Sequence, residues 1–224
     1  MALVVQIKVH PSLYVRDPEE TVLGRKIIGD SIRLIDQIGF EEFTFKKLAT
    51  KIKSTEASVY RYFRNKNQLL AYLVSWYWEW LQYLIQVRTM NVDDPRKQME
   101  VALAVLIDSS KYDPAIPHVD EALLHRICVA ESARVYLTKH KKGEKFAGLF
   151  QGYEDLCAQL LTFMKSLNPK YKYSRELVSA IIAAVHNQVF YTEIAAGAMK
   201  GELKDVKGER TLEFLNHLVF TSLG

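Results

Sequence analysis

The sequence predicts an all-α protein with two parts, a helix-turn-helix segment followed by a longer helical body. Apolar residues recur at helical spacing along almost all of the 224 residues. Thr44 and Thr55, which are good capping residues, each stand before a short amphipathic segment. Only residues 3–9 look strand-like, and one isolated strand cannot build a sheet.

The first helix is expected over residues 17–39. Asp17 can cap this helix, Pro18 suits its first position, and Gly39 is typical of a C-terminal cap. Two short helices, one long helix and five further helices should follow. We place them at residues 44–52, 56–62, 66–90, 95–110, 118–139, 144–167, 174–199 and 208–221.

Positive charge is concentrated in the N-terminal third of the chain. The net charge is +4, and all of it lies in residues 1–75, because residues 76–224 carry equal numbers of acidic and basic side chains. Within residues 42–66 only Glu42 and Glu56 oppose a set of cations. The cations are Lys46, Lys47, Lys51, Lys53, Arg61, Arg64 and Lys66. This concentration favours a polyanionic partner, although an ordinary solvated surface would also explain charge alone.

Other classes of function have little support in the sequence. No apolar run is long enough to span a membrane, and the N-terminus lacks the features of a secretory signal. Cys128 and Cys157 are expected to be buried thiols in a reducing compartment. The histidines are scattered, and no phosphate loop, nucleophile motif or zinc-binding spacing occurs. We therefore expect no enzymatic activity, no cofactor, no metal and no membrane partner.

The two short helices have the arrangement of a helix-turn-helix unit, whose second helix enters the DNA major groove. Val59 and Phe63 should anchor this second helix to the interior, so that Ala57 and Arg61 point outward. Three polar residues flank the outward pair: Ser58, Tyr60 and Tyr62. Arg61 can bind guanine through two hydrogen bonds, and the flanking hydroxyl groups can donate to phosphates.

The segment FTFKKLATKIKSTEASVYRYFRNKNQLL resembles the signature of the TetR family of transcriptional regulators. Several residues stand at the spacing of that family: Leu48, Ala49, Tyr60, Phe63, Lys66, Leu69 and Leu70. Together with RKIIGDSIRLIDQIGFEEFT, which resembles the first helix of the family, the similarity covers residues 22–72. The rest of the chain resembles the family only in being helical. The resemblance implies a DNA-binding regulator.

The resemblance also implies roles for individual residues. Thr44 and Lys46 match positions that touch the DNA backbone, and Lys66 matches the lysine that contacts a phosphate. The DNA-binding positions at the second short helix are Thr55, Glu56, Ala57, Ser58, Tyr60, Arg61 and Tyr62.

Two features depart from the pattern of the family. Lys53-Ser54 stands where Gly-Val is usual, so either Lys53 adopts a positive φ or the turn differs. Glu56 is unusual beside phosphates. It could accept a hydrogen bond from cytosine N4 or simply complement the helix dipole, and we favour the dipole.

The helical body is expected to bind an effector and to join two copies of the chain. Aromatic side chains there could line a pocket or form ordinary core. The pocket candidates are Trp80, Tyr83, Phe146, Phe150, Tyr153 and Phe163. The helices at 144–167 and 174–199 resemble the dimerisation pair of the family, and the second of them combines small and aliphatic residues.

The sequence thus predicts an arm at residues 1–16, a DNA-binding domain at 17–66 and a ligand-binding and dimerisation domain at 67–224. We expect a cytoplasmic homodimer that binds a near-palindromic operator on double-stranded DNA, as a repressor relieved by an apolar or amphipathic small molecule. One alternative is a helical small-molecule-binding protein or enzyme in which the helix-turn-helix is only structural. Another is a protein whose basic region binds an anionic membrane or an acidic protein.

Overall fold

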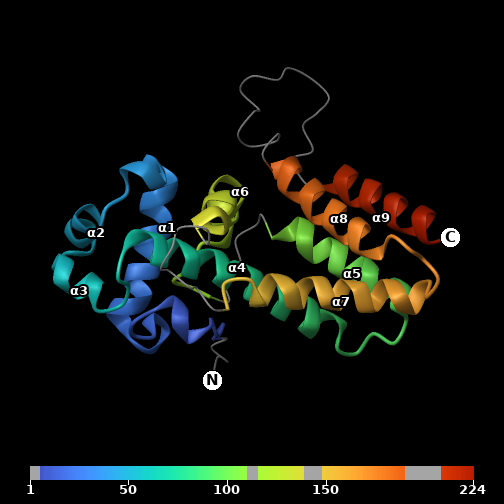
Figure 1. Cartoon of the computed structure of the whole chain (residues 1–224), viewed down its shortest axis with the longest axis horizontal. Coiled ribbons are helices and arrows are strands. Elements are labelled where there is room, and N and C mark those ends of the chain that lie inside the picture. The colour runs from blue at the N-terminus through green and yellow to red at the C-terminus, as the bar shows by residue number, and fades with distance from the viewer. Residues whose placement is uncertain (1–5, 110–115, 139–147, 190–207) are drawn as a thin grey trace, which may run out of the picture. The chain divides into compact units, whose positions relative to one another are not determined.

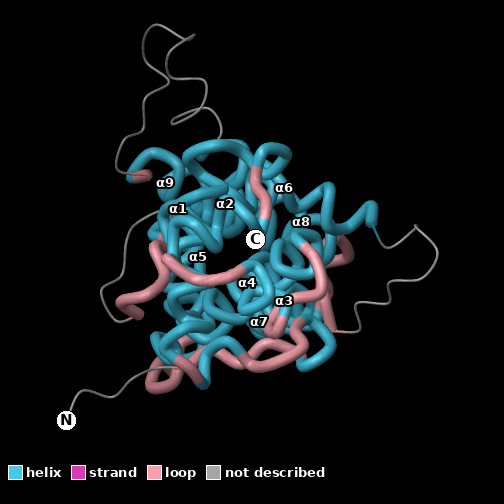
Figure 2. Tube along the Cα trace, turned by 90° about the vertical axis from the view of Figure 1, so that its left-hand side faces the viewer, coloured by secondary structure: helices cyan, strands magenta, loops and turns pink. Residues whose placement is uncertain are grey.

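The computed structural model describes residues 6–109, 116–138, 148–189 and 208–224 (Figure 1). These residues form helices and loops without a strand, as Figure 2 shows, so the predicted all-α fold is confirmed for this part of the chain. Two 3-10 turns precede the α-helices: η1 (Pro11–Leu13) and η2 (Pro18–Glu20). The α-helices are α1 (Val22–Glu42), α2 (Phe45–Ile52), α3 (Glu56–Tyr60), α4 (Lys66–Thr89), α5 (Pro95–Asp108), α6 (Glu121–Thr138), α7 (Gln151–Leu167), α8 (Ser174–Val189) and α9 (Glu209–Leu223). None of the helices described is long and apolar enough to cross a membrane.

The first helix begins later than predicted. Asp17 caps the short turn η2, where its carboxylate accepts a hydrogen bond from the Glu19 N–H at 2.8 Å. Thr21 caps α1 by accepting from the Gly24 N–H at 2.9 Å. Near the other end, Gly39 breaks the helical path with a φ of 77°. Its ψ of 157° lies outside the left-handed helical region of a glycine cap, in a region that essentially only glycine adopts, so Gly39 ends the regular helix by a kink.

The chain divides into two compact units, which are described separately. Unit 1 comprises residues 1–80 and 111–152, and unit 2 comprises residues 81–110 and 153–224. The predicted domain boundary after residue 66 falls inside unit 1, because the first part of α4 and the whole of α6 pack with the helix-turn-helix. In unit 2, α5, α8 and α9 pack on one another.

Helix α6 packs directly on α1 within unit 1. The approach is close near Gly29, where a Cβ atom would lie 2.3 Å from the carbonyl oxygen of His118. Polar contacts join the chain around α6 to the chain around α1. His118 Nε2 lies 3.0 Å from both carboxylate oxygens of Glu19. Arg126 donates to the two carboxylate oxygens of Asp36 at 2.9 and 3.0 Å. Arg134 forms an ion pair with Glu41 at 2.6 Å. These charged contacts, which no sequence motif marks, fix α6 and the segment before it to α1 and η2.

The described part of the N-terminal arm braces α3 and α4. The Val15 N–H donates to the Tyr62 carbonyl oxygen at 2.8 Å. The Gln68 amide group donates to the Ser12 carbonyl oxygen at 3.1 Å, and Leu13 between them is fully buried. The arm therefore supports the end of α3 from within unit 1.

Candidate nucleic-acid interface

Helix α2 is capped at both ends by side chains of unit 1. Thr44 accepts a hydrogen bond from the Lys47 N–H at 3.2 Å, as predicted for an N-cap. At the other end the Lys26 ammonium donates to the Ile52 carbonyl oxygen at 3.0 Å. The inner face of α2 carries Leu48, Ala49 and Ile52, which are all buried. These contacts hold α2 firmly against α1.

The turn between α2 and α3 depends on Lys53. This residue has φ 54° and ψ 51°, so of the two alternatives left open by the sequence the structure has the positive φ. The Lys53 N–H donates to the Thr50 carbonyl oxygen at 3.2 Å, and the Ser54 N–H donates to the Ala49 carbonyl oxygen at 2.9 Å. This pair of bonds is a Schellman motif, in which glycine is the usual residue. Lys53 adopts the glycine conformation at some cost in free energy.

Helix α3 is anchored inward and exposed outward. It spans Glu56–Tyr60, two residues fewer than predicted, and Thr55 caps it by accepting from the Ser58 N–H at 3.2 Å. Val59 and Phe63 are fully buried. Ala57 and Arg61 are exposed, as the sequence predicts. The outward side of α3 is therefore available to a partner.

Hydrogen bonds arrange the polar side chains on the exposed side of α3. The Thr55 and Ser58 hydroxyl oxygens lie 2.8 Å apart, and Arg61 Nη2 donates to the Ser58 hydroxyl oxygen at 3.1 Å. On the other flank the Tyr60 hydroxyl lies 3.4 Å from a Glu56 carboxylate oxygen. Because these contacts limit side-chain motion, the exposed side is partly ordered before any partner binds.

Tyr62 does not lie where the sequence analysis placed it. Its side chain is 3% exposed, and its hydroxyl shares a hydrogen bond with Thr21 Oγ1 at 2.8 Å. Because α3 ends at Tyr60, the helical spacing that predicted an outward position no longer applies to Tyr62. The expected contact with a phosphate is therefore corrected to a packing role.

Lys66 also differs from its expected role. Its ammonium group donates to three carbonyl oxygens at 3.0, 2.9 and 3.2 Å, those of Phe40, Glu41 and Phe43. An ammonium has three donors, so all of them are used within unit 1. In the structure Lys66 joins the end of α1 to the start of α4 and offers no free donor to a phosphate.

Five cations on and around α2 and α3 are exposed and make no ion pair with any described residue. They are Lys46, Lys51, Lys53, Arg61 and Arg64. Lys47 is paired with Glu42 at 3.1 Å instead. Exposed cations of this kind can neutralise phosphates and release counterions, which is the main source of affinity for DNA.

The predicted pocket residues fall in both units. Trp80 and Phe150 belong to unit 1, whereas Tyr83, Tyr153 and Phe163 belong to unit 2. Trp80 is buried and stacks on Trp76 with 6.3 Å between ring centroids. Phe163 is buried, and the other three are half-buried. Phe146 lies outside the described residues.

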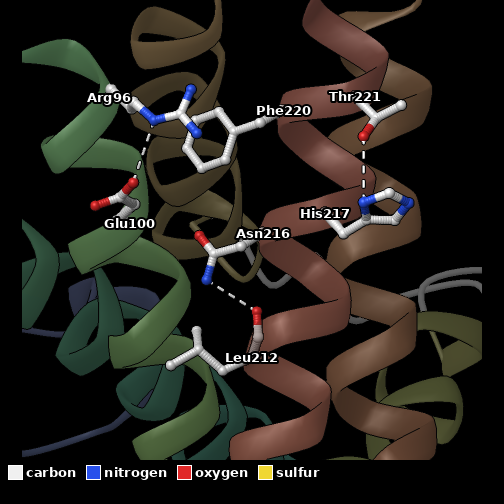
Figure 3. A pocket seen from close by; sticks show the side chains of 7 residues that line it. All are labelled: Arg96, Glu100, Leu212, Asn216, His217, Phe220 and Thr221. Atoms are coloured by element: carbon white, nitrogen blue, oxygen red, sulfur yellow. Dashed lines mark hydrogen bonds and ion pairs between the residues drawn. The ribbon is translucent and has the colours of Figure 1, made fainter.

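Unit 2 contains a groove of about 540 Å³ between α5 and α9 (Figure 3). Arg96 lies over the ring of Phe220 at 3.9 Å and 3.4 Å from the Glu100 carboxylate. Asn216 donates to the Leu212 carbonyl oxygen at 2.9 Å. The groove also borders His217 and Thr221. Sequence reasoning missed it because α5 and α9 are far apart in the chain and no motif marks either wall.

Two of the scattered histidines, His118 and His125, have protein partners. His118 pairs with Glu19, and His125 Nδ1 lies 2.6 Å from the Tyr77 hydroxyl oxygen inside unit 1. Within the described segments, no three His, Cys, Asp or Glu side chains gather closely enough to hold a metal ion.

A family model described as bacterial regulatory proteins of the tetR family matches residues 27–73, which run from α1 into α4. Residues 27–73 therefore form a domain of the TetR-family type. The match spans the capped α2, the turn at Lys53 and the exposed side of α3, so the observed geometry and the family agree on one DNA-binding region.

Solved structures with the same fold include regulators of this family. AibR in complex with isovaleryl coenzyme A and operator DNA has a TM-score of 0.62 at 17% identity, over 88% of this chain and 98% of AibR. The fatty acid degradation regulator FadR from Bacillus halodurans has a TM-score of 0.56 at 15% identity, over 89% and 93%. A TetR transcriptional regulator from Legionella pneumophila has a TM-score of 0.54 at 16% identity, over 91% and 98%. At these identities the similarity shows the fold. No curated protein matches the chain by sequence.

Replacing Lys53 by glycine should stabilise the TetR-family domain. Glycine removes the cost of the left-handed conformation, and the expected gain is about 0.5–1 kcal/mol in the free energy of unfolding, after allowing for the greater freedom of glycine in the unfolded chain. Chemical denaturation of the full chain measures it. Lys53→Ala is the matched control, because it removes the charge but retains Cβ. An equal gain in both variants would show that charge repulsion, and not backbone strain, is relieved.

Replacing Lys66 by methionine should destabilise the fold without changing the salt dependence of DNA binding. The variant keeps an apolar stem but loses three charged hydrogen bonds, and we expect a loss of about 1.5–3 kcal/mol. Lys51→Met, at an exposed position of α2, is the control and should leave stability almost unchanged. If Lys66 instead contacts a phosphate, Lys66→Met would keep its stability and reduce the slope of log K against log salt by about one.

Proposed function

We propose that this TetR-family chain is a sequence-specific regulator that binds a near-palindromic operator as a homodimer and represses transcription in the cytoplasm until a small molecule binds. The observation that carries the proposal is the exposed side of α3, where Ala57 and Arg61 point away from the core between hydrogen-bonded neighbours. This side has the size and chemistry that the major groove accepts.

Recognition is proposed to divide between charge and base contacts. The exposed cations around α2 and α3 would bind phosphates and supply affinity without sequence preference. Arg61 would supply preference through two hydrogen bonds to guanine. The small side chain of Ala57 would let the backbone of α3 approach the base edges.

The effector that relieves repression is proposed to be an apolar or amphipathic small molecule. The similar AibR structure contains isovaleryl coenzyme A together with operator DNA, which makes a ligand-responsive regulator reasonable for this fold. The aromatic residues predicted for the pocket remain candidates. The groove between α5 and α9 is a second candidate, since its Arg96 and Phe220 offer one charged and one apolar contact.

The homodimer is proposed to form through the last helices. The sequence analysis chose residues 144–167 and 174–199. The exposed side of α7 is mostly polar, however: apart from Ala158, its exposed residues are Gln151, Glu154, Asp155, Thr162, Lys165 and Ser166. Helix α8 exposes Arg175, Glu176 and Asn187, but it also exposes a group of small residues that allow close approach: Ser179, Ala180 and Ala183. Helix α9, which packs beside α8, exposes Phe214. The exposed faces therefore favour α8 with α9 over α7 with α8.

Replacing Arg61 by alanine should relax the sequence preference of the protein. Losing a bidentate contact costs about 1–3 kcal/mol of discrimination at one base pair of each half-site. Fluorescence titration of the best genomic fragment and of its single-base variants measures this cost. Lys51→Ala is the control and should weaken binding to all sequences alike. If both variants weaken every sequence equally, Arg61 does not read a base. If the wild-type protein binds no fragment more tightly than bulk DNA, the proposal of sequence-specific binding is wrong.

Replacing Ala183 by arginine should convert the proposed dimer to a monomer, because a long charged side chain prevents the close approach of α8. Sedimentation equilibrium of the wild-type and variant chains measures the association. Thr162→Arg makes the same change on the exposed side of α7 and should leave the dimer intact. The opposite pattern would restore α7 to the interface, and a monomeric wild-type protein would exclude the homodimer.

A further inference from the structure

The exposed side of α3 carries one carboxylate, that of Glu56, among the cations of the helix-turn-helix. We propose that Glu56 reads a cytosine in each operator half-site by accepting a hydrogen bond from its N4 amino group. This inference rests on the proposed function, since it assigns part of the sequence that the same interface recognises.

The side chains on α3 form two polar groups of opposite character. At about 100° per residue, Ala57 and Arg61 share the most outward direction of the helix, with Glu56 and Tyr60 on one flank and Ser58 on the other. The guanidinium of Arg61 leans toward Ser58, to which it donates at 3.1 Å, and thus away from Glu56. The donor and the acceptor on this surface are therefore held apart and can address different bases.

The Glu56 carboxylate is oriented but not neutralised. Its hydrogen-bond partner is the Tyr60 hydroxyl, at 3.4 Å. The Tyr60 ring is itself fixed by an edge contact with Phe45, 5.1 Å between centroids. No lysine or arginine of the described residues forms an ion pair with this carboxylate. An exposed acceptor without a cationic partner among the described residues therefore remains on the flank of α3 beside Tyr60.

The alternative favoured by the sequence, that Glu56 complements the helix dipole, is weakened by the geometry. Helix α3 spans only Glu56–Tyr60. Few peptide units are aligned in such a short helix, so its dipole is small. Thr55 already accepts from the Ser58 N–H, and the helix has its cap without the carboxylate. Stability of α3 gives little reason for an acid at this position.

Base chemistry selects cytosine as the partner. A carboxylate near the DNA backbone is repelled by phosphates, and it is tolerated only where a hydrogen-bond donor faces it. Cytosine presents its N4 amino donor to the major groove. Adenine places the acceptor N7 beside its amino group, and guanine and thymine present acceptors. Glu56 should therefore favour cytosine and disfavour the other three bases at one position.

Selection of bound duplexes from a random library, followed by sequencing, tests the assignment with the full-length chain. Wild-type protein should enrich one cytosine per half-site in addition to the base read by Arg61. Glu56→Gln should reduce the preference for that cytosine about tenfold, while the preference that depends on Arg61 persists. Glu20→Gln, which removes an equal charge from an exposed site on η2 of unit 1, should keep both preferences.

The outcomes separate the inference from the proposed function. If Glu56→Gln selects the same bases as the wild-type protein at every position, the cytosine assignment is wrong while sequence-specific binding stands. If Glu20→Gln also loses the cytosine, the effect is one of net charge and the assignment is equally wrong. If the wild-type protein enriches no sequence, the proposed function fails together with the inference.

Discussion

The burial of Val59 and Phe63 beneath α3 is the constraint on which the recognition surface depends. A helix of five residues is not stable alone in water, because nucleation costs more than so few hydrogen bonds return. Thr55 caps it, and the two buried side chains fix its rotation about its own axis. Ala57 and Arg61 face outward as a direct result, since they lie on the opposite side of the same short helix.

The lysines of this region have two different functions. Lys26 and Lys66 donate to carbonyl oxygens at the ends of α2 and α1, where the backbone acceptors of a helix would otherwise be unpaired. Lys46 and Lys51 lie exposed and unpaired among the described residues of the surface. The net charge of this region therefore overstates the charge available to DNA, because Lys26 and Lys66 use their ammonium groups to join helix ends within the domain.

The sequence predicted the local features of the fold well, because caps, anchors and turns depend on neighbouring residues. The N-caps Thr44 and Thr55 are examples. It failed where the partners are distant. Lys66 reaches carbonyl groups 23 to 26 residues earlier in the chain, and no motif marks those acceptors. Tyr62 was misplaced because α3 ends two residues early.

The extent of the DNA-binding unit was hidden for the same reason. Contacts such as that between His118 and Glu19 join the segment before α6 to η2, which precedes α1, across 99 residues of sequence. Local patterns give no sign of such a contact, so the sequence could not show that α6 packs on α1. The groove between α5 and α9 likewise became visible only once the two helices were placed together.

Protection of guanine N7 from dimethyl sulfate, which attacks this atom in the major groove, tests the central claim most directly. The outward side of α3, presented twice by a dimer, should protect guanines in two major-groove segments whose centres lie one helical turn, about 34–36 Å, or a multiple of it apart. Tight binding that leaves every guanine N7 of the bound fragment reactive would contradict the account.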